Sequence, residues 1–437
     1  MKDRYHLVSL KDCGVELIDC VHKTPKACKS GYPYISIPDM KDGRVLLDNS
    51  RLISEIDMND WNAKCNPIPG DVILSRRCNP GVTAVIPDGF QGTLGQNLVL
   101  LRSSDKGIDQ NYLRWAVKSK QWWNEVNRYI NVGAIFESLR CADIPKFEIP
   151  LPSQIEQKAI ANILGTLDEK IELNKKTNET LEDISKALFK SWFINFDPVI
   201  AKEDMSSEVF PDKINQLFQN SLSNNEFGKI PKGWKICKLK NIFEIKKGST
   251  PSTRNEENWH PGIFEWVSPR DLSKSNSIYF SSARKISEAG LKKIKSGLCP
   301  IGTILISSRA PIGLMGISSG DVSLGTGIFG ILPDKNISSG LIYLYLKNII
   351  KNLKQLSIGT TFEEISLKIF SDYEIIFPDE EFLYNTKNIF DSIFEKIKVN
   401  SSEIKTLSKL KDTLLPKLIS GELRITDAEK MIDEVGI

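Results

Sequence analysis

The chain has 437 residues, of which 26% are charged and 41% hydrophobic, and its formal net charge is +3. This length allows about two or three domains, each with its own core. No apolar run reaches membrane-spanning length, and the opening MKDRYHLVSLKDCG lacks the apolar segment of a signal peptide. We therefore exclude a membrane-spanning protein and expect a cytoplasmic one.

The eight cysteines and three histidines do not form a metal-binding pattern. No Cys-x-x-Cys pair occurs, and the histidines are scattered along the chain. A zinc site needs several such side chains at short spacings. We therefore expect reduced thiols and no metal site.

Residues 1–152, which we call head 1, carry short apolar runs separated by glycine, proline and aspartate. This pattern is typical of strands. A single helix is expected from Gln110 to about Arg128, because apolar side chains recur there at helical spacing. We predict a mixed α/β domain whose strands are YPYISIPD, GRVLLD, GDVILS, VTAVIP and NLVLLR.

Residues 153–196, the first rod, show a heptad seam with alternating steps of four and three residues. Only Gly165 interrupts an otherwise good helical composition. A helix of this length spans roughly 60 Å, so it needs a partner helix along its side. The seam positions are Ile160, Leu164, Leu167, Ile171, Asn174, Asn178, Leu181, Ser185, Leu188 and Trp192.

Residues 197–229 are polar and form a predicted linker to head 2, residues 230–379, which repeats head 1 in order. Thr24-Pro25 returns as Thr250-Pro251. GDVILSRRCNPG returns as GTILISSRAPIG, and LGQNLVLL returns as LGTGIFGIL. Several unrelated motifs recurring in one order indicate one structural unit written twice.

Residues 380–421, the second rod, carry the same seam, and residues 422–437 form a tail. Asn400 follows Asn174 by 226 residues and is the matching polar position. In an antiparallel helix pair we expect the two amides to face each other and fix the register, although an asparagine near solvent is also tolerated. The predicted fold class is α+β, with two tandem mixed α/β domains and two long helices that pair as an antiparallel coiled coil.

Catalytic motifs are missing from the sequence. It contains no Walker loop, no GxSxG elbow and no HExxH pair. One enzymatic alternative is a metal-dependent nuclease, because a carboxylate precedes a Glu-x-Lys pair twice. These two sets are Asp212 with Glu244 and Lys246, and Asp379 with Glu403 and Lys405.

The sequence carries more features of nucleic-acid binding than of catalysis. Residues 230–300 contain fourteen Lys and Arg against six Asp and Glu. Each GDVILSRR-type strand ends in a basic tip, and Arg, Lys, Asn, Gln, Ser and Thr can bind phosphates or base edges. An alternative is a coiled-coil scaffold whose heads bind proteins. The candidate DNA-binding residues are His22, Lys23, Lys26, Arg76, Arg77, Gln96, Asn97, Lys246, Lys247, Ser249, Thr250, Arg254, Trp259, Arg270, Ser308 and Arg309.

Two heads on a rod of roughly 60 Å can occupy one duplex without sharing a groove segment, since a DNA turn is about 34 to 36 Å. We therefore expect a split target with an unread spacer. Because the heads differ in sequence, the two half-sites should differ as well.

Several motifs together resemble a type I restriction-modification DNA specificity subunit. They are LPSQIEQKAIANILGTLDEKIELNKK, SWFINFDPV, GKIPKGW and LLPKLISGEL, set in a head-rod-head-rod order that covers nearly the whole chain. The resemblance implies that each head is a target recognition domain and each rod a conserved helical region. It also implies a subunit without catalysis of its own that binds double-stranded DNA.

The same resemblance implies two methyltransferase subunits as partners, which use S-adenosylmethionine, and restriction subunits that use ATP and Mg²⁺. No cofactor is expected in this chain. The resemblance places Arg76, Arg77 and Arg309 on the DNA-facing side of the heads.

Overall fold

The computed structural model describes residues 5–104, 107–132, 137–203, 215–219, 221–226, 228–357 and 363–434. The chain divides into two compact units. Unit 1 comprises Met1–Glu172 and Lys405–Ile437, and unit 2 comprises Leu173–Ile404. Each unit therefore joins one head to part of both rods. Among the described residues, no helix combines the length and apolar character needed to cross a membrane.

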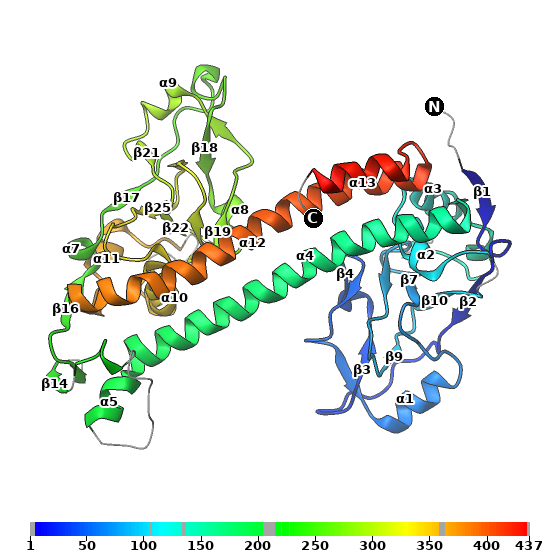
Figure 1. Cartoon of the computed structure of the whole chain (residues 1–437), viewed down its shortest axis with the longest axis horizontal. Helices are drawn as coiled ribbons and strands as arrows, with labels where there is room; N and C mark the ends of the chain where they lie inside the picture. The colour runs from blue at the N-terminus through cyan, green and yellow to red at the C-terminus, as the bar shows by residue number, and fades with distance from the viewer. Residues whose placement is uncertain are drawn as a thin grey trace. The chain divides into compact units, whose positions relative to one another are not determined.

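Head 1 is built on a six-stranded sheet and a three-stranded sheet (Figure 1). The runs GDVILS and NLVLLR, which were predicted as strands, form two central strands whose apolar side chains are buried. The larger sheet has the order β2 (Val15–Asp19), β10 (Leu98–Ser103), β7 (Val72–Ser75), β8 (Thr83–Val85), β5 (Arg44–Val45) and β4 (Met40–Lys41). The smaller sheet has the order β6 (Arg51–Ile53), β3 (Tyr32–Ile35) and β9 (Thr93–Leu94). Two further pairs of strands are β1 (His6–Ser9) with β13 (Glu148–Leu151), and β11 (Asn131–Val132) with β12 (Glu137–Ser138).

The single helix predicted from Gln110 to Arg128 is wrong, because two helices occupy this segment. The Ser119 side chain accepts a hydrogen bond from the backbone N–H of Trp122 at 3.2 Å and starts a new helix. The helical segments of unit 1 outside the rods are η1 (Ile37–Asp39), α1 (Glu55–Asn62), α2 (Gln110–Ala116), α3 (Lys120–Tyr129), η2 (Ile144–Lys146) and α13 (Ile425–Asp433).

Head 2 has a five-stranded and a four-stranded sheet. The first has the order β17 (Ile245–Lys247), β25 (Ile328–Ile331), β22 (Ile304–Ser307), β23 (Met315–Ser318) and β19 (Ile278–Tyr279). The second has the order β20 (Lys285–Ile286), β18 (Phe264–Val267), β24 (Val322–Leu324) and β21 (Leu298–Cys299). Strand β16 (Lys235–Lys238) pairs with β26 (Glu374–Phe377). The helical segments are α7 (Leu239–Ile242), η4 (Glu256–Asn258), α8 (Pro269–Leu272), α9 (Glu288–Leu291), α10 (Ser339–Gln355) and α11 (Leu367–Asp372).

The segment predicted as a linker contains regular structure where it is described. Helix α5 (Asp197–Glu203) begins it, and the hairpin of β14 (Leu222–Asn225) and β15 (Gly228–Pro231) ends it.

The predicted internal repeat is confirmed at the level of strand order. The series β2-β10-β7-β8 of head 1 corresponds to β17-β25-β22-β23 of head 2. In both heads a parallel pair joins the smaller sheet, β3 with β9 and β18 with β24. The two heads therefore share one framework, as the repeated motifs indicated.

The two rods form the long helices α4 (Gln154–Phe189), which continues as the π-helical turn η3 (Lys190–Asn195), and α12 (Glu380–Ser420). In unit 2 they run antiparallel, because Asn174 contacts Glu403 while the ring of Trp192, further along the chain in η3, packs against that of Phe390 with the ring centroids 6.3 Å apart. Asp168 pairs with Lys411 in unit 1. The predicted seam is confirmed, since its apolar members are buried or partly buried along both helices.

The predicted hydrogen bond between Asn174 and Asn400 is wrong. The Asn174 amide donates instead to Glu403 Oε2 at 2.8 Å, and the Asn400 amide donates to Asn178 Oδ1 at 3.0 Å. The helices are staggered by about one turn from the expected alignment, so Asn400 lies opposite Asn178. Asn174 and Asn400 are nevertheless both buried. Their role in fixing the register remains a prediction.

Charged side chains attach head 1 to the rods within unit 1. Asp168 of α4 accepts hydrogen bonds from Arg44 at 2.5 Å, from Lys411 of α12 at 2.6 Å and from Arg114 of α2 at 3.4 Å. Burial alone would raise the pKa of Asp168, but these cations and Lys118 hold it below its ordinary value. We call this group the Asp168 cluster.

Aromatic side chains attach head 2 to the rods within unit 2. Phe394 of α12 follows Asp168 by 226 residues and takes the matching position. Its ring lies 5.8 Å from that of Tyr343 in α10. Tyr345, also in α10, packs edge-on against Phe189 of α4 at 4.9 Å. The contact between head and rods is therefore ionic in unit 1 and apolar in unit 2.

Candidate nucleic-acid interface

The candidate interface of head 1 is organised by the turn that follows β7. The backbone N–H of Arg76 donates to the carbonyl of Asn97 at 2.9 Å, and the N–H of Leu139 donates to the carbonyl of Arg76 at 2.9 Å. Beyond Arg77 the chain enters positive φ at Cys78 (56°) and Asn79 (129°). The strand end is thus fixed on both sides, and the turn projects from it.

A groove of about 650 Å³ lies beside this turn. Its exposed wall is more apolar than polar, but Asn79, Gln96 and Asn97 are among its lining residues, together with Lys41 and Arg51. The remaining lining residues are Thr24, Tyr34, Ser36, Ile37, Pro38, Met40, Cys78, Gly95 and Leu98. A concave surface with amides and cations suits base edges and phosphates.

The loop that carries Gln96 is held in place by hydrogen bonds. The N–H of Gln96 donates to the Tyr34 hydroxyl at 3.1 Å, and that hydroxyl donates to the Lys23 carbonyl at 3.3 Å. His22 contacts the Gln96 carbonyl through Nδ1 at 3.0 Å. Gly95 precedes the loop because a Cβ there would lie 2.7 Å from the Ile35 carbonyl oxygen. His22 and Lys23 therefore support the loop that carries Gln96.

Arg76 was predicted to contact DNA, but the structure places it inside head 1. Only 8% of the residue is exposed, its Nη1 donates to the Leu139 carbonyl at 3.4 Å, and its Nη2 lies 3.9 Å from Asp19. Burial opposes ionisation of Asp19, yet His22, Lys64 and Arg76 hold its pKa below the ordinary value. Arg76 therefore anchors the turn from inside the head.

Head 2 repeats the arrangement with other side chains. The N–H of Ser308 donates to the Gly327 carbonyl at 2.8 Å, which matches the bond between Arg76 and Asn97. Ser308 itself is a second correction, since only 1% of it is exposed. Arg309 has a side chain that is 49% exposed and pairs with Glu364 at 3.1 Å. Lys247 lies 3.7 Å from the same carboxylate.

Trp259 is a third correction. It is 4% exposed and packs edge-on against Trp266 at 5.3 Å. The guanidinium of Arg284 lies 3.4 Å above its ring, so the indole is covered. The Thr250 hydroxyl bonds to the Thr326 hydroxyl at 2.7 Å, at the loop that matches Gln96 and Asn97.

The other predicted residues are spread over the surfaces of the heads. Lys23, Lys26 and Arg77 are exposed in head 1, and Arg254 and Arg270 are exposed in head 2. Lys246 lies 3.7 Å from Glu244, and Ser249 is half-buried.

Of the residues that line the groove of head 1, only Gln96 and Asn97 were predicted from the sequence; the missed ones include the cations Lys41 and Arg51 and the amide Asn79. Asn79 had a usable signal, because it stands in the CNPG turn directly after the basic tip. Lys41 and Arg51 reach the groove only through the pairing of distant strands.

One group of metal-type ligands occurs among the described residues, Asp19, Cys20 and His22. Its atoms are used for other contacts. The Cys20 thiol donates to the Gly95 carbonyl at 3.1 Å, and burial raises its pKa to about 11. Both ring nitrogens of His22 contact protein oxygens. The group suits a hydrogen-bonded support of the Gln96 loop.

The carboxylates of the nuclease alternative have structural contacts where they are described. Asp379 caps α12 by accepting from the Phe382 N–H at 2.9 Å, and Glu403 accepts from Asn174 at 2.8 Å. Asp212 lies outside the described residues.

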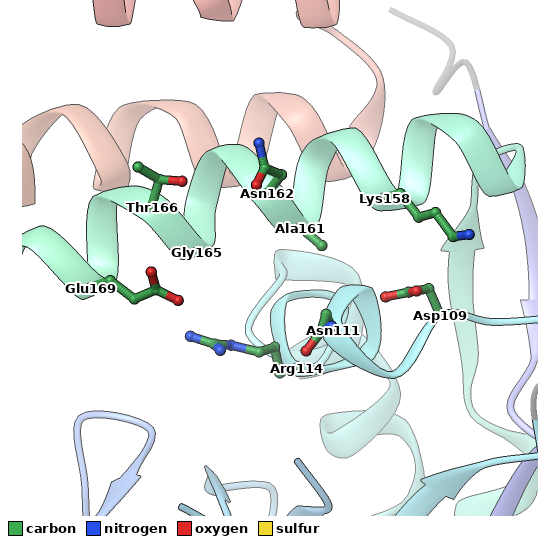
Figure 2. Close-up of a pocket in the computed structure, with 9 residues that line it drawn as sticks. All are labelled: Asp109, Asn111, Arg114, Lys158, Ala161, Asn162, Gly165, Thr166 and Glu169. Carbon is green, nitrogen blue, oxygen red and sulfur yellow. The ribbon is translucent and has the colours of Figure 1, made fainter. Parts of the chain in front are cut away.

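A second hollow, of about 440 Å³, lies in unit 1 between α2 and α4 (Figure 2). Arg114 and Lys158 line it together with Asp109 and Glu169. The figure shows Arg114 reaching from α2 toward Glu169 on α4. Charges of both signs balance in this hollow, so it does not favour a polyanion. The other lining residues are Asn111, Ala161, Asn162, Gly165 and Thr166.

Comparison with known proteins gives a consistent result. The chain is 29% identical over 348 residues to the HindI specificity subunit of Haemophilus influenzae, covering 69% of this chain and 75% of that protein. It is 28% identical over 373 residues to the MjaIX specificity subunit of Methanocaldococcus jannaschii, covering 82% and 78%. The crystal structure of a type I restriction-modification S subunit from M. genitalium shares the fold, with a TM-score of 0.63, 18% identity and coverage of 96% and 97%.

The family described as "Type I restriction modification DNA specificity domain" matches residues 19–183 and 231–410. These two matches correspond to the two heads and the parts of the rods that follow them. They cover most of the chain and repeat once, as the strand orders of the two heads do. The chain therefore belongs to the family of type I restriction-modification DNA specificity proteins.

Proposed function

We propose that this chain is a non-catalytic DNA-reading subunit and that each head reads one half of a split, asymmetric target. One observation carries the proposal: the two heads share a backbone framework but differ where it projects. Cys78 and Asn79 stand where Ala310 and Pro311 stand in head 2. The bond from Arg76 to Asn97 has its counterpart between Ser308 and Gly327. A common frame with different projecting side chains suits two different half-sites.

Two classes of contact are proposed within each head. Exposed cations away from the groove, such as Lys26, Arg77 and Arg254, would bind phosphates and set the position of the duplex. Gln96 in the groove of head 1, and Arg309 at the corresponding turn of head 2, would read base edges.

The helix pair is proposed to set the spacer and to dock two methyltransferase subunits. Large apolar side chains that are exposed outside the seam support docking, because they are available to pack against a partner. Leu173 and Ile184 are exposed on α4, and Tyr384 and Val399 are exposed on α12. S-adenosylmethionine would be used by the docked methyltransferases, and ATP and Mg²⁺ by restriction subunits.

The test is adenine methylation in a host that has no methylation of its own. This chain is expressed together with a type I methyltransferase subunit from its own host, and modified adenines are mapped along the genome. We expect a split motif that disappears when this chain is omitted. Absence of new methylation, with both proteins expressed and associated, would contradict the proposal and favour a scaffold that binds proteins.

A further inference from the structure

We infer that Asn79 determines base specificity in head 1, where it acts with Gln96 and Asn97 to read an A·T base pair. This inference rests on the proposed function. It identifies the kind of base pair read and adds a residue that the sequence did not single out.

Three residues with carboxamide side chains line one groove although they come from two separate segments. Asn79 belongs to the turn after β7, and Gln96 and Asn97 belong to the loop before β10. All three line the same groove of about 650 Å³. The hydrogen bond from the Arg76 N–H to the Asn97 carbonyl, at 2.9 Å, ties the two segments together at this point. Their relative position is therefore set by the backbone.

The three side chains keep their hydrogen-bonding capacity. Within the part of the chain that the structure describes, none of these carboxamides bonds to another protein group. Other carboxamides of unit 1 do: Asn62 donates to the Gly92 carbonyl at 3.0 Å, and Gln157 donates to the Pro152 carbonyl at 3.0 Å. A free carboxamide offers one acceptor and two donors, the set that pairs with N6 and N7 of adenine in the major groove.

The backbone of Asn79 is strained for a residue with a side chain. Its φ of 129° lies in a region that glycine adopts readily, and its neighbour Cys78 has a φ of 56°. The turn bond from the Val82 N–H goes to the Asn79 carbonyl at 3.4 Å, so it does not need the side chain. Strained residues persist where the side chain has another use. Base reading supplies that use for an exposed amide in a groove.

Head 2 has no carboxamide at the corresponding positions. Pro311 replaces Asn79, and Thr326 and Gly327 replace Gln96 and Asn97. The Thr326 hydroxyl is bonded to Thr250 at 2.7 Å. The amide set of head 1 therefore has no counterpart at these positions of head 2, and a change there should leave the other half-site unaltered.

The test is Asn79→Gly in the complete chain, co-expressed with its methyltransferase. Glycine removes the amide and relieves the backbone strain, so the variant should be at least as stable as the wild type in thermal unfolding. Preference for one A·T pair in a single half-site should fall by roughly 5- to 150-fold, while the other half-site stays the same. Gln96→Ala should relax the same half-site. Asn124→Ala removes an exposed carboxamide of α3 outside the groove and serves as the matched control.

An unchanged motif in Asn79→Gly would overturn the inference and leave the proposed function intact. The inference would also be overturned if Asn79→Gly and Gln96→Ala relaxed base preference in different half-sites, or if the position that lost its preference were not an A·T pair. If the glycine variant unfolds at a lower temperature, Asn79→Asp, which keeps the side-chain size but removes the amide donors, is judged by the same criterion. Failure of the wild-type chain to direct methylation would instead contradict the proposed function itself.

Discussion

Replacing Asp168 with asparagine should destabilise unit 1 strongly. The carboxylate is only 11% exposed and contacts Arg44, Arg114 and Lys411 within 2.5 to 3.4 Å. Removing one partner of a buried ion pair costs about 3 to 5 kcal/mol, because it leaves uncompensated charges. Since Asp168 keeps some exposure, we expect about 3 kcal/mol. In a unit of this size that lowers the Tm by roughly 6 to 12 °C.

Differential scanning calorimetry of the full chain measures this shift. The matched control is Asp183→Asn, which removes a carboxylate of the same helix that is 77% exposed and paired with Lys186 at 3.0 Å. An exposed pair contributes at most about 1 kcal/mol, so the control should lower the Tm by no more than about 4 °C. Equal decreases in Tm for the two variants would refute the assignment of Asp168 as the centre of the contact between head 1 and the rods.

The pH dependence of the Asp168→Asn effect has a definite sign. The folded-state pKa of Asp168 is lowered from 3.8, because cations outweigh the opposing effect of burial. Its stabilising contribution is therefore complete above the unfolded pKa and is lost as the pH falls through the lower, folded value. The difference between wild type and Asp168→Asn should be constant near pH 7 and shrink below about pH 4. A difference that grows toward acid would contradict this explanation.

Three further outcomes are expected. Burial lowers the pKa of Lys118 to about 8, so keeping this side chain protonated at lower pH costs folding free energy. Lys118→Met should therefore raise the Tm measured by calorimetry at pH 7, and this gain should vanish by about pH 10.5, where the lysine is half-deprotonated in the unfolded chain as well. Arg309→Ala should lower methylation about tenfold with assembly unchanged, whereas Lys335→Ala, an exposed cation elsewhere in head 2, should have no effect; equal methylation rates would remove Arg309 from the interface. The double variant Asn174→Leu and Asn400→Leu should keep or raise the Tm while loosening the register, and an unchanged half-site spacing without new oligomers would count against the register role.

The rods and the repeat were predictable because their signals are local and periodic. A heptad seam fixes which side of a helix is buried whatever partner covers it, so the positions from Ile160 to Trp192 are buried or partly buried as expected. The stagger between the helices was not predictable by matching one sequence to the other. It depends on how the two helices interdigitate, and it brings Asn400 opposite Asn178.

The candidate site was predictable only in outline. The strand ending at Ser75 and the loop at Gln96 were identified, but their surroundings depend on residues far away in the chain. Leu139 covers Arg76 from a segment 63 residues later. Trp259 is buried because Trp266 and Arg284 close over it, and neither contact has a local signature. Tertiary context decides which polar or aromatic side chains remain available.

The Asp168 cluster also defines what must travel together if a head is transplanted between specificity proteins. A graft cut at residue 152 would carry Arg44, Arg114 and Lys118 but leave behind Asp168, their shared counter-ion. A graft cut after Glu172 would keep the carboxylate, and Lys411 of α12 would have to come with it. The natural module for domain shuffling is therefore discontinuous in sequence, joining the first 172 residues to the last 33.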